Sequence, residues 1–73
     1  MSDLEALLHT GLYEAVQERF KGWSCEINTH SCGDFVNVHL ILKSDRVLAS
    51  VGKYQVGVNE ENFYKQIIGE LKC

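Results

Sequence analysis

The sequence predicts an α+β fold in which a three-stranded antiparallel meander carries both of its helices on one face. Apolar residues recur at helical spacing near each end of the chain and alternate with polar residues in the middle, where short polar segments separate the alternating stretches. The predicted order of elements is therefore α-β-β-β-α. Residues 1–73 form one domain, because a chain of 73 residues has no room for a second.

The first helix is predicted from its N-terminal cap and its apolar stripe. Ser2 followed by Glu5 has the pattern of a capping box, so the helix begins at residue 2 or 3. The stripe runs from Leu4 to Phe20 at three- and four-residue spacing. Gly11 in the middle indicates either a close contact or a break at which Thr10 caps a second piece. We favour one continuous helix.

Three strands and a second helix follow. Apolar residues occupy alternate positions over residues 23–30, 35–42 and 47–56, which is typical of half-buried strands. Asn59 then has the pattern of a helix cap, with Glu60 and Glu61 in the first turn, where negative charge suits the helix dipole. The apolar stripe of this last helix ends at Leu71.

The lengths of the two loops predict a register. With residues 31–34 as the first loop and Ser44-Asp45 as the second, Ile27 pairs with Val38 and Leu40 with Ala49. The two hairpins then agree on one inner, helix-covered face: Trp23, Cys25, Ile27, Val36, Val38, Leu40, Leu42, Val47, Ala49 and Val51. Two helices fill one sheet face, so we expect the opposite face to be left uncovered by this chain.

The uncovered face is the predicted partner-binding site, with two apolar or aromatic rows bracketing two polar ones. Its candidate residues are Phe35, Tyr54, Ile41, Leu48, His39, Glu26 and His30. This pattern favours a small non-catalytic interaction module, an adaptor, inhibitor or chaperone-like regulator that binds a protein partner or forms a homodimer. An alternative within the same class is a protein encoded by a phage or mobile element that inhibits a host machine.

Two clusters invite a chemical interpretation. The predicted register places Glu26, His39 and Ser50 in one row, in the order of a hydrolase triad, but a flat sheet face provides neither an oxyanion hole nor a pocket. His30, Cys32 and Asp34 offer two or three metal ligands near the first loop, whereas a closed zinc site needs four. We therefore predict no enzyme activity, no metal, no cofactor and no small-molecule substrate.

Composition excludes further classes of function. The net charge of −3 and the scattered basic residues argue against broad attraction to nucleic acid or an anionic membrane. No apolar stretch approaches the roughly 18 residues of a membrane span. The odd number of cysteines, Cys25, Cys32 and Cys73, and the lack of a secretory signal predict a reducing, cytoplasmic location.

The order α-β-β-β-α resembles that of the double-stranded RNA-binding domain and, more loosely, of the small Alu-binding proteins of the signal recognition particle. The resemblance implies RNA binding, for which that domain uses clustered lysines at the start of its last helix. The matching stretch here is Asn59-Glu60-Glu61-Asn62, which has the opposite charge. Lys43, Arg46 and Lys53 form only a weak basic edge, so nucleic-acid binding remains an alternative to protein binding.

Overall fold

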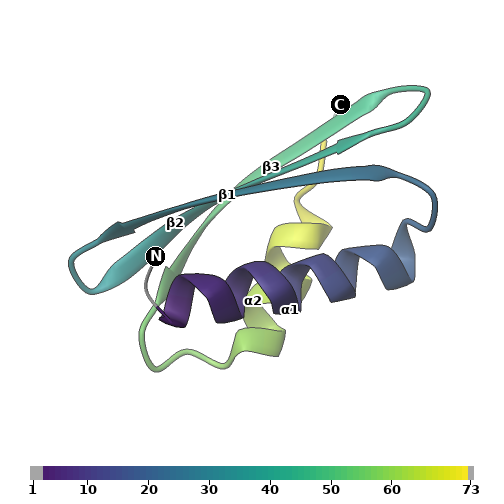
Figure 1. The fold of residues 1–73 in the computed structure, drawn as a ribbon. Helices are drawn as coiled ribbons and strands as arrows, with labels where there is room; N and C mark the ends of the chain where they lie inside the picture. The colour runs from purple at the N-terminus through teal and green to yellow at the C-terminus, as the bar shows by residue number, and fades with distance from the viewer. Residues whose placement is uncertain (1–2, 73) are drawn as a thin grey trace.

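The chain forms a helix, three antiparallel strands in one sheet, and a second helix, which confirms the predicted fold class (Figure 1). The computed structural model describes residues 3–72. Its elements are α1 (Asp3–Arg19), β1 (Ser24–Cys32), β2 (Phe35–Lys43), β3 (Val47–Gln55) and α2 (Glu60–Gly69). No helix in this part of the chain is long and apolar enough to cross a membrane.

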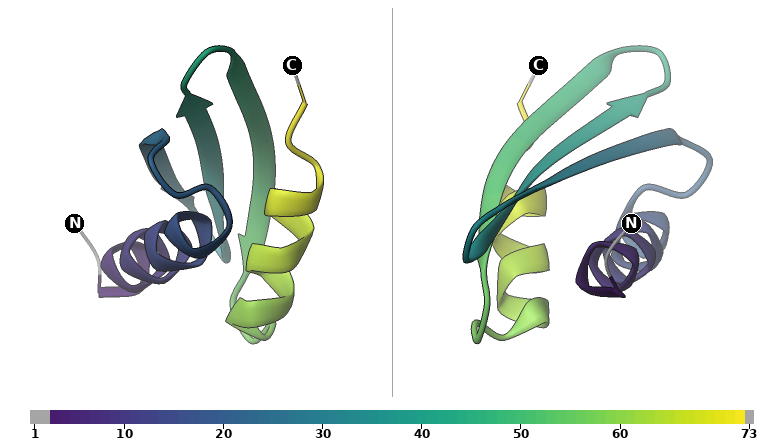
Figure 2. Two further views of the ribbon diagram at one scale, coloured as in Figure 1. Left: turned by 90° about the vertical axis from the view of Figure 1, so that its right-hand side faces the viewer. Right: turned by 60° about the vertical axis from the view of Figure 1, so that its left-hand side comes forward.

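The elements make two layers. The strands lie in the order β1-β2-β3, and both helices lie on the same side of the sheet, α1 against β1 and α2 against β3 (Figure 2). The core between the layers contains Leu8, Leu12, Val16, Ile27, Val36, Val38, Leu40, Leu42, Leu48, Tyr54, Phe63, Ile67 and Ile68. Neither helix covers the other face of the sheet.

Helix α1 is continuous through Gly11, as predicted. A Cβ atom at this position would overlap the hydroxyl of Tyr64 on α2, so the glycine allows a close contact between the two helices. The predicted cap at Ser2 lies outside the described residues. On α2 the predicted cap is confirmed, because the Asn59 side chain accepts a hydrogen bond from the Asn62 N–H at 3.2 Å.

The first hairpin has a shorter loop than the sequence suggested. Gly33 and Asp34 form a two-residue turn, and Gly33 has the positive φ of 64° that the first position of a type II′ turn requires. Ile27 therefore pairs with Leu40 and not with Val38. The shift is two residues, so every side chain of β1 keeps its predicted face.

The second hairpin has a longer loop than predicted, and its correction is larger. Residues 44–46 form the loop, and the Ser44 N–H donates to the carbonyl of Arg46 at 2.9 Å. The register thus moves by one residue, which exchanges the two faces of β3. The inward residues of β3 are Leu48, Ser50, Gly52 and Tyr54, whereas the sequence-based prediction placed Val47, Ala49 and Val51 inside.

Packing against α2 explains why β3 takes this register. Tyr54 is only 3% exposed, its ring lies edge-on to Phe63 with centroids 5.3 Å apart, and its hydroxyl donates to the Val58 carbonyl at 2.7 Å. A Cβ atom on Gly52 would lie 3.1 Å from both Ile67 Cδ1 and Phe63 Cε1. Only the register that turns the glycine and the tyrosine inward lets α2 pack this closely.

Candidate interaction surface

The outer face is the side of the sheet that turns away from both helices. Alternation along the strands places on it Ser24, Glu26, Asn28, His30 and Cys32 from β1, Phe35, Asn37, His39, Ile41 and Lys43 from β2, and Val47, Ala49, Val51, Lys53 and Gln55 from β3. The column from β1 is polar, whereas β2 and β3 contribute all the large apolar side chains. The outer face therefore has a polar side and an apolar side.

The apolar side is an aliphatic patch of four residues, Ile41, Val47, Ala49 and Val51. Ile41 lies directly opposite Ala49, and the two valines flank Ala49 along β3. Val47 is 52% exposed and Val51 59% exposed, while Ile41 is half-buried by its neighbours. Charged and polar side chains border the patch, because Lys43 lies opposite Val47 and His39 opposite Val51.

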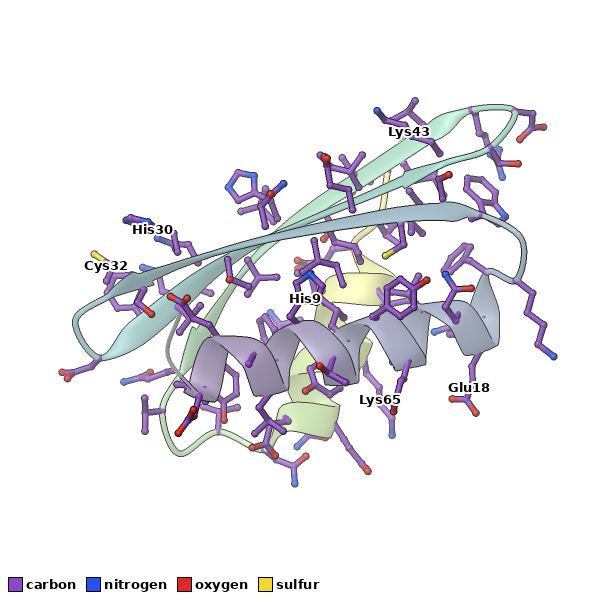
Figure 3. All side chains as sticks on the ribbon, viewed as in Figure 1. His9, Glu18, His30, Cys32, Lys43 and Lys65 are labelled. Atoms are coloured by element: carbon purple, nitrogen blue, oxygen red, sulfur yellow. The ribbon has the colours of Figure 1, made fainter. Side chains whose placement is uncertain are left out.

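The other end of the outer face is aromatic and polar. Lys53 Nζ lies 4.2 Å from the centroid of the Phe35 ring, a cation–π contact that holds both side chains over the sheet. His30 pairs with Asn37, which in turn pairs with Lys53. In Figure 3, His30 and Cys32 lie near one end of the sheet and Lys43 near the other.

Five of the predicted site residues lie on the outer face: Phe35, Ile41, His39, Glu26 and His30. The prediction was wrong for Leu48 and Tyr54, which are buried in the core beneath β3. The prediction missed Val47 and Val51, because the two-residue loop predicted for the second hairpin, Ser44-Asp45, placed them on the inner face. Gly52 was the available signal, since a glycine between two strand residues indicates a close approach by another element.

The triad-like row does not form. Glu26 lies opposite Ile41, and His39 lies between Asn28 and Val51. Ser50 points to the opposite side of the sheet, where its hydroxyl is buried and makes no hydrogen bond to the described residues. The three side chains therefore cannot act together as acid, base and nucleophile.

The loop cluster of His30, Cys32 and Asp34 is not gathered into a ligand set either. Among residues 3–72, no three His, Cys, Asp or Glu side chains converge as metal ligands would. Cys32 is exposed on the outer face, whereas Cys25 is half-buried on the inner face. Burial raises the pKa of the Cys25 thiol and so lowers the fraction of it that is present as the reactive thiolate.

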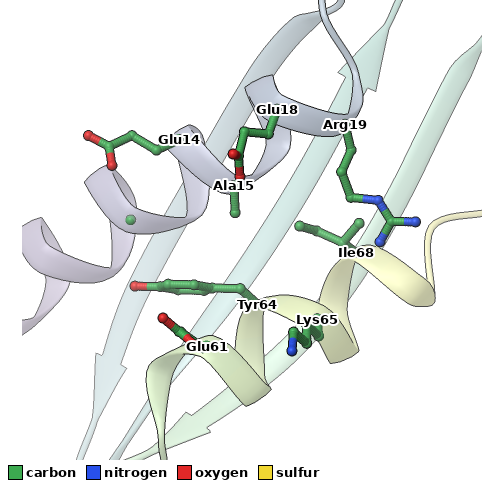
Figure 4. A pocket seen from close by; sticks show the side chains of 9 residues that line it. Glu14, Ala15, Glu18, Arg19, Glu61, Tyr64, Lys65 and Ile68 are labelled. Carbon is green, nitrogen blue, oxygen red and sulfur yellow. The ribbon is translucent and has the colours of Figure 1, made fainter.

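A concavity of about 300 Å³ lies at the β3 edge beside Ala49 and Val51, and a second one lies in the helix layer, away from the outer face. This second concavity is a groove of about 680 Å³ between α1 and α2 (Figure 4). Its lining residues are Gly11, Glu14, Ala15, Glu18, Arg19, Glu61, Tyr64, Lys65 and Ile68. Burial, and after it the negative charge of Glu60, raises the pKa of Tyr64. The lining contains no serine, cysteine or histidine.

Charge also divides the molecule by layer. Both helices begin with acidic residues, Asp3 and Glu5 on α1 and Glu60 and Glu61 on α2. The charged side chains of the outer face are Glu26, Lys43 and Lys53. The acidic side chains at the start of each helix therefore repel phosphate groups, while the outer face carries a small positive excess.

The chain was compared with models of protein families, with curated proteins and with solved structures, and none of them matched.

Proposed function

We propose that this protein is a small non-catalytic interaction module, an adaptor, inhibitor or chaperone-like regulator, that binds a protein partner through its outer face, alone or as a homodimer. The aliphatic patch is the observation that carries the proposal. Val47 and Val51 leave more than half of their surface in water, although burying a valine fully is worth about 1.5–3 kcal/mol. A partner that covers the patch recovers this free energy.

The arrangement of the outer face supports a protein partner. The fully buried core of an interface is apolar and its rim is polar. Here the aliphatic patch has that core character, and Glu26, His39 and Lys43 surround it with groups that can hydrogen-bond at a rim. Phe35, held by Lys53, supplies an aromatic anchor at the far end of the face.

Other functional classes find less support in the same residues. A nucleic-acid module of the double-stranded RNA-binding type needs cations at the start of its last helix, where this chain carries Glu60 and Glu61. An enzyme needs a catalytic set beside a concavity, and the outer-face residues that border one, Ala49 and Val51, are both aliphatic. We also propose a reducing, cytoplasmic location, because the three cysteines cannot all pair within one chain.

The test compares charge substitutions inside and outside the patch. Val51→Glu and Ile41→Glu place a carboxylate in the patch, and Leu7→Glu makes the same change at a 54% exposed residue of α1. Each variant is immobilised beside the wild type, and the proteins captured from lysate are quantified by mass spectrometry. Circular dichroism checks that every variant is folded.

We expect one set of captured proteins to be lost with both patch variants and retained with Leu7→Glu, because a buried unpaired carboxylate is costly at an interface. Equal capture by all three variants would mean that the patch is not the binding surface. Loss with Leu7→Glu alone would assign the interaction to the helix layer.

A further inference from the structure

The two edges of the sheet differ in what satisfies their backbone groups. At the β3 edge the Ala49 N–H donates to the Lys72 carbonyl at 2.9 Å, and the Lys72 N–H donates to the Ala49 carbonyl at 3.1 Å. The segment after α2 thus pairs with β3 at Ala49, the third of its nine residues. Such pairing, together with an outward Lys53, is how natural sheets protect an edge.

The β1 edge has no comparable cover. The backbone groups of Ala49 bond Lys72 and so point away from β2, which leaves the even-numbered residues of β3 to hydrogen-bond to β2. By the same alternation the odd-numbered residues of β2 hydrogen-bond to the even-numbered residues of β1. The odd residues Cys25, Ile27, Thr29 and Ser31 therefore direct their N–H and C=O groups away from the sheet. No backbone group in residues 3–72 bonds to them. Over its nine residues, β1 contains no proline, lysine or bulge.

We propose that β1 pairs with β1 of a second copy, antiparallel and over its full length, so that two chains share one six-stranded sheet. The two-fold axis passes beside Asn28, which lies directly opposite Asn28 of the second copy. Cys25 then forms a hydrogen-bonded pair with Ser31 of the second copy, and Ile27 forms one with Thr29. Every unpaired backbone group of the β1 edge is satisfied in this register.

Hydrogen-bond complementarity between side chains singles out this register. It places Glu26 directly opposite His30 of the second copy, and the symmetry repeats the pair on the other side of the axis. Both side chains are exposed on the outer face. The Glu26 carboxylate can accept a hydrogen bond from an N–H of the His30 imidazole, and favourable cross-strand pairs contribute about 0.2–1 kcal/mol each. A shift of two residues in either direction shortens the pairing and separates Glu26 from His30.

An exposed aromatic residue lies beside the same edge. Tyr13 on α1 is 45% exposed. Gly11 marks the side of α1 that meets α2, and Tyr13, two residues further along the helix, lies roughly 200° around the helix axis from that side. Since α2 lies under β3, this flank of α1 is the one nearest the open edge of β1. Joining two copies brings this apolar surface closer to its symmetry mate.

The dimer also explains how so small a sheet can bind a partner. One outer face of three nine-residue strands measures on the order of 400 Å², about half of the roughly 800 Å² that each side of a standard interface buries. Two joined sheets reach that area. The inference goes beyond the proposed function, since two copies can join whether or not the outer face binds a partner.

Cross-linking at the axis tests the register directly. Asn28→Cys places two thiols opposite each other across the proposed axis, within the Cα separation that a disulfide needs. Asn37→Cys is the matched control, because it also adds an outer-face thiol but lies on β2. Peptide mapping by mass spectrometry separates the new links from those of the native cysteines. In this register Cys32 faces Ser24 and Cys25 faces Ser31, so no native cysteines are paired.

We expect a disulfide between the two introduced thiols in most of the oxidised Asn28→Cys protein and no corresponding link in Asn37→Cys. Equal linking of both variants would show random collision and would overturn the proposal. So would a failure of Asn28→Cys to link while the protein sediments as a monomer at the highest concentration reached.

An exchange of the two side chains tests this complementarity. His30→Glu puts two carboxylate pairs into the interface and is expected to weaken self-association about five- to tenfold in sedimentation experiments. The double variant Glu26→His with His30→Glu restores the pairs in exchanged positions and is expected to recover the wild-type association. No recovery would overturn the register. Val51→Glu is expected to leave the dimer intact, so loss of partner capture and loss of dimerisation are measured separately.

Discussion

The two faces of the sheet carry similar side chains in very different surroundings. Val38 on the inner face is 0% exposed, whereas Val51 on the outer face, diagonally across the β2–β3 pair, is 59% exposed. Both are β-branched and suit a strand equally well. The difference between them comes from the helices, which cover one face and leave the other open. Apolar character alone therefore does not say which side of a strand is the core.

Matched valine substitutions should show the largest contrast between the faces. Val38→Ala removes buried methyl groups and leaves a cavity, so we expect a loss of about 2–3 kcal/mol in the free energy of unfolding. Val51→Ala removes atoms that already contact water, and its effect should stay within about 0.5 kcal/mol. Urea unfolding of both variants measures the contrast.

A loss of more than about 1 kcal/mol for Val51→Ala at high dilution would show that Val51 is packed within a single chain. The open outer face would then be the wrong interpretation. If the loss appears only at high protein concentration, it reports an interface between copies, and the contrast between the faces is sharpened.

The contrast between the two hairpins shows how far the sequence determines the fold. On β1 only one phase of the alternation is apolar, with Cys25 and Ile27 against Glu26 and Asn28, so its inner face was predicted although the loop length was wrong. On β3 both phases are apolar, and Val47 and Val51 compete with Leu48 and Tyr54 for the core. The order of elements, the cap of α2 and the continuous α1 needed no such choice.

The candidate surface was predicted only as far as this register allowed. Residues of β1 and β2 on the outer face, such as Glu26, Phe35 and Ile41, were placed correctly. The valines of β3 were not, because their placement depends on α2, whose contacts with Gly52 and Tyr54 join segments distant in sequence. The edge pairing by Lys72 was also missed, since a single bridge leaves no periodic pattern in the sequence.

Two serines extend the comparison to polar side chains. The Ser50 hydroxyl is buried on the inner face without a hydrogen-bond partner in the described residues, which costs free energy in the folded state. Ser50→Ala removes that hydroxyl, and we expect a gain of about 1 kcal/mol in stability. Ser24→Ala changes an exposed outer-face serine of β1 and should leave stability nearly unchanged. Thermal unfolding compares the two variants, and destabilisation by Ser50→Ala would show that its hydroxyl is satisfied.

Two cysteines on β1 give the smallest and most local contrast. Cys25 is half-buried on the inner face, where burial raises the pKa of its thiol above the ordinary value of 9.0, and Cys32 is exposed on the outer face. Alkylation needs the thiolate, so at a pH below 9.0 we expect iodoacetamide to modify Cys32 faster than Cys25. In denaturant the two rates should become similar. Peptide mapping distinguishes both from Cys73.

The same pKa shift fixes the sign of a small pH effect. The folded state holds the Cys25 proton more tightly than the unfolded state, so this contribution to stability is complete below pH 9.0 and is lost as pH rises through the folded-state pKa. Cys25→Ala should therefore reduce the alkaline loss of stability, whereas Cys32→Ala should not, as urea unfolding on both sides of pH 9.0 will measure. Equal alkaline loss in both variants would mean that Cys25 is as open to solvent as Cys32, and that the two faces of β1 do not differ at this end of the strand.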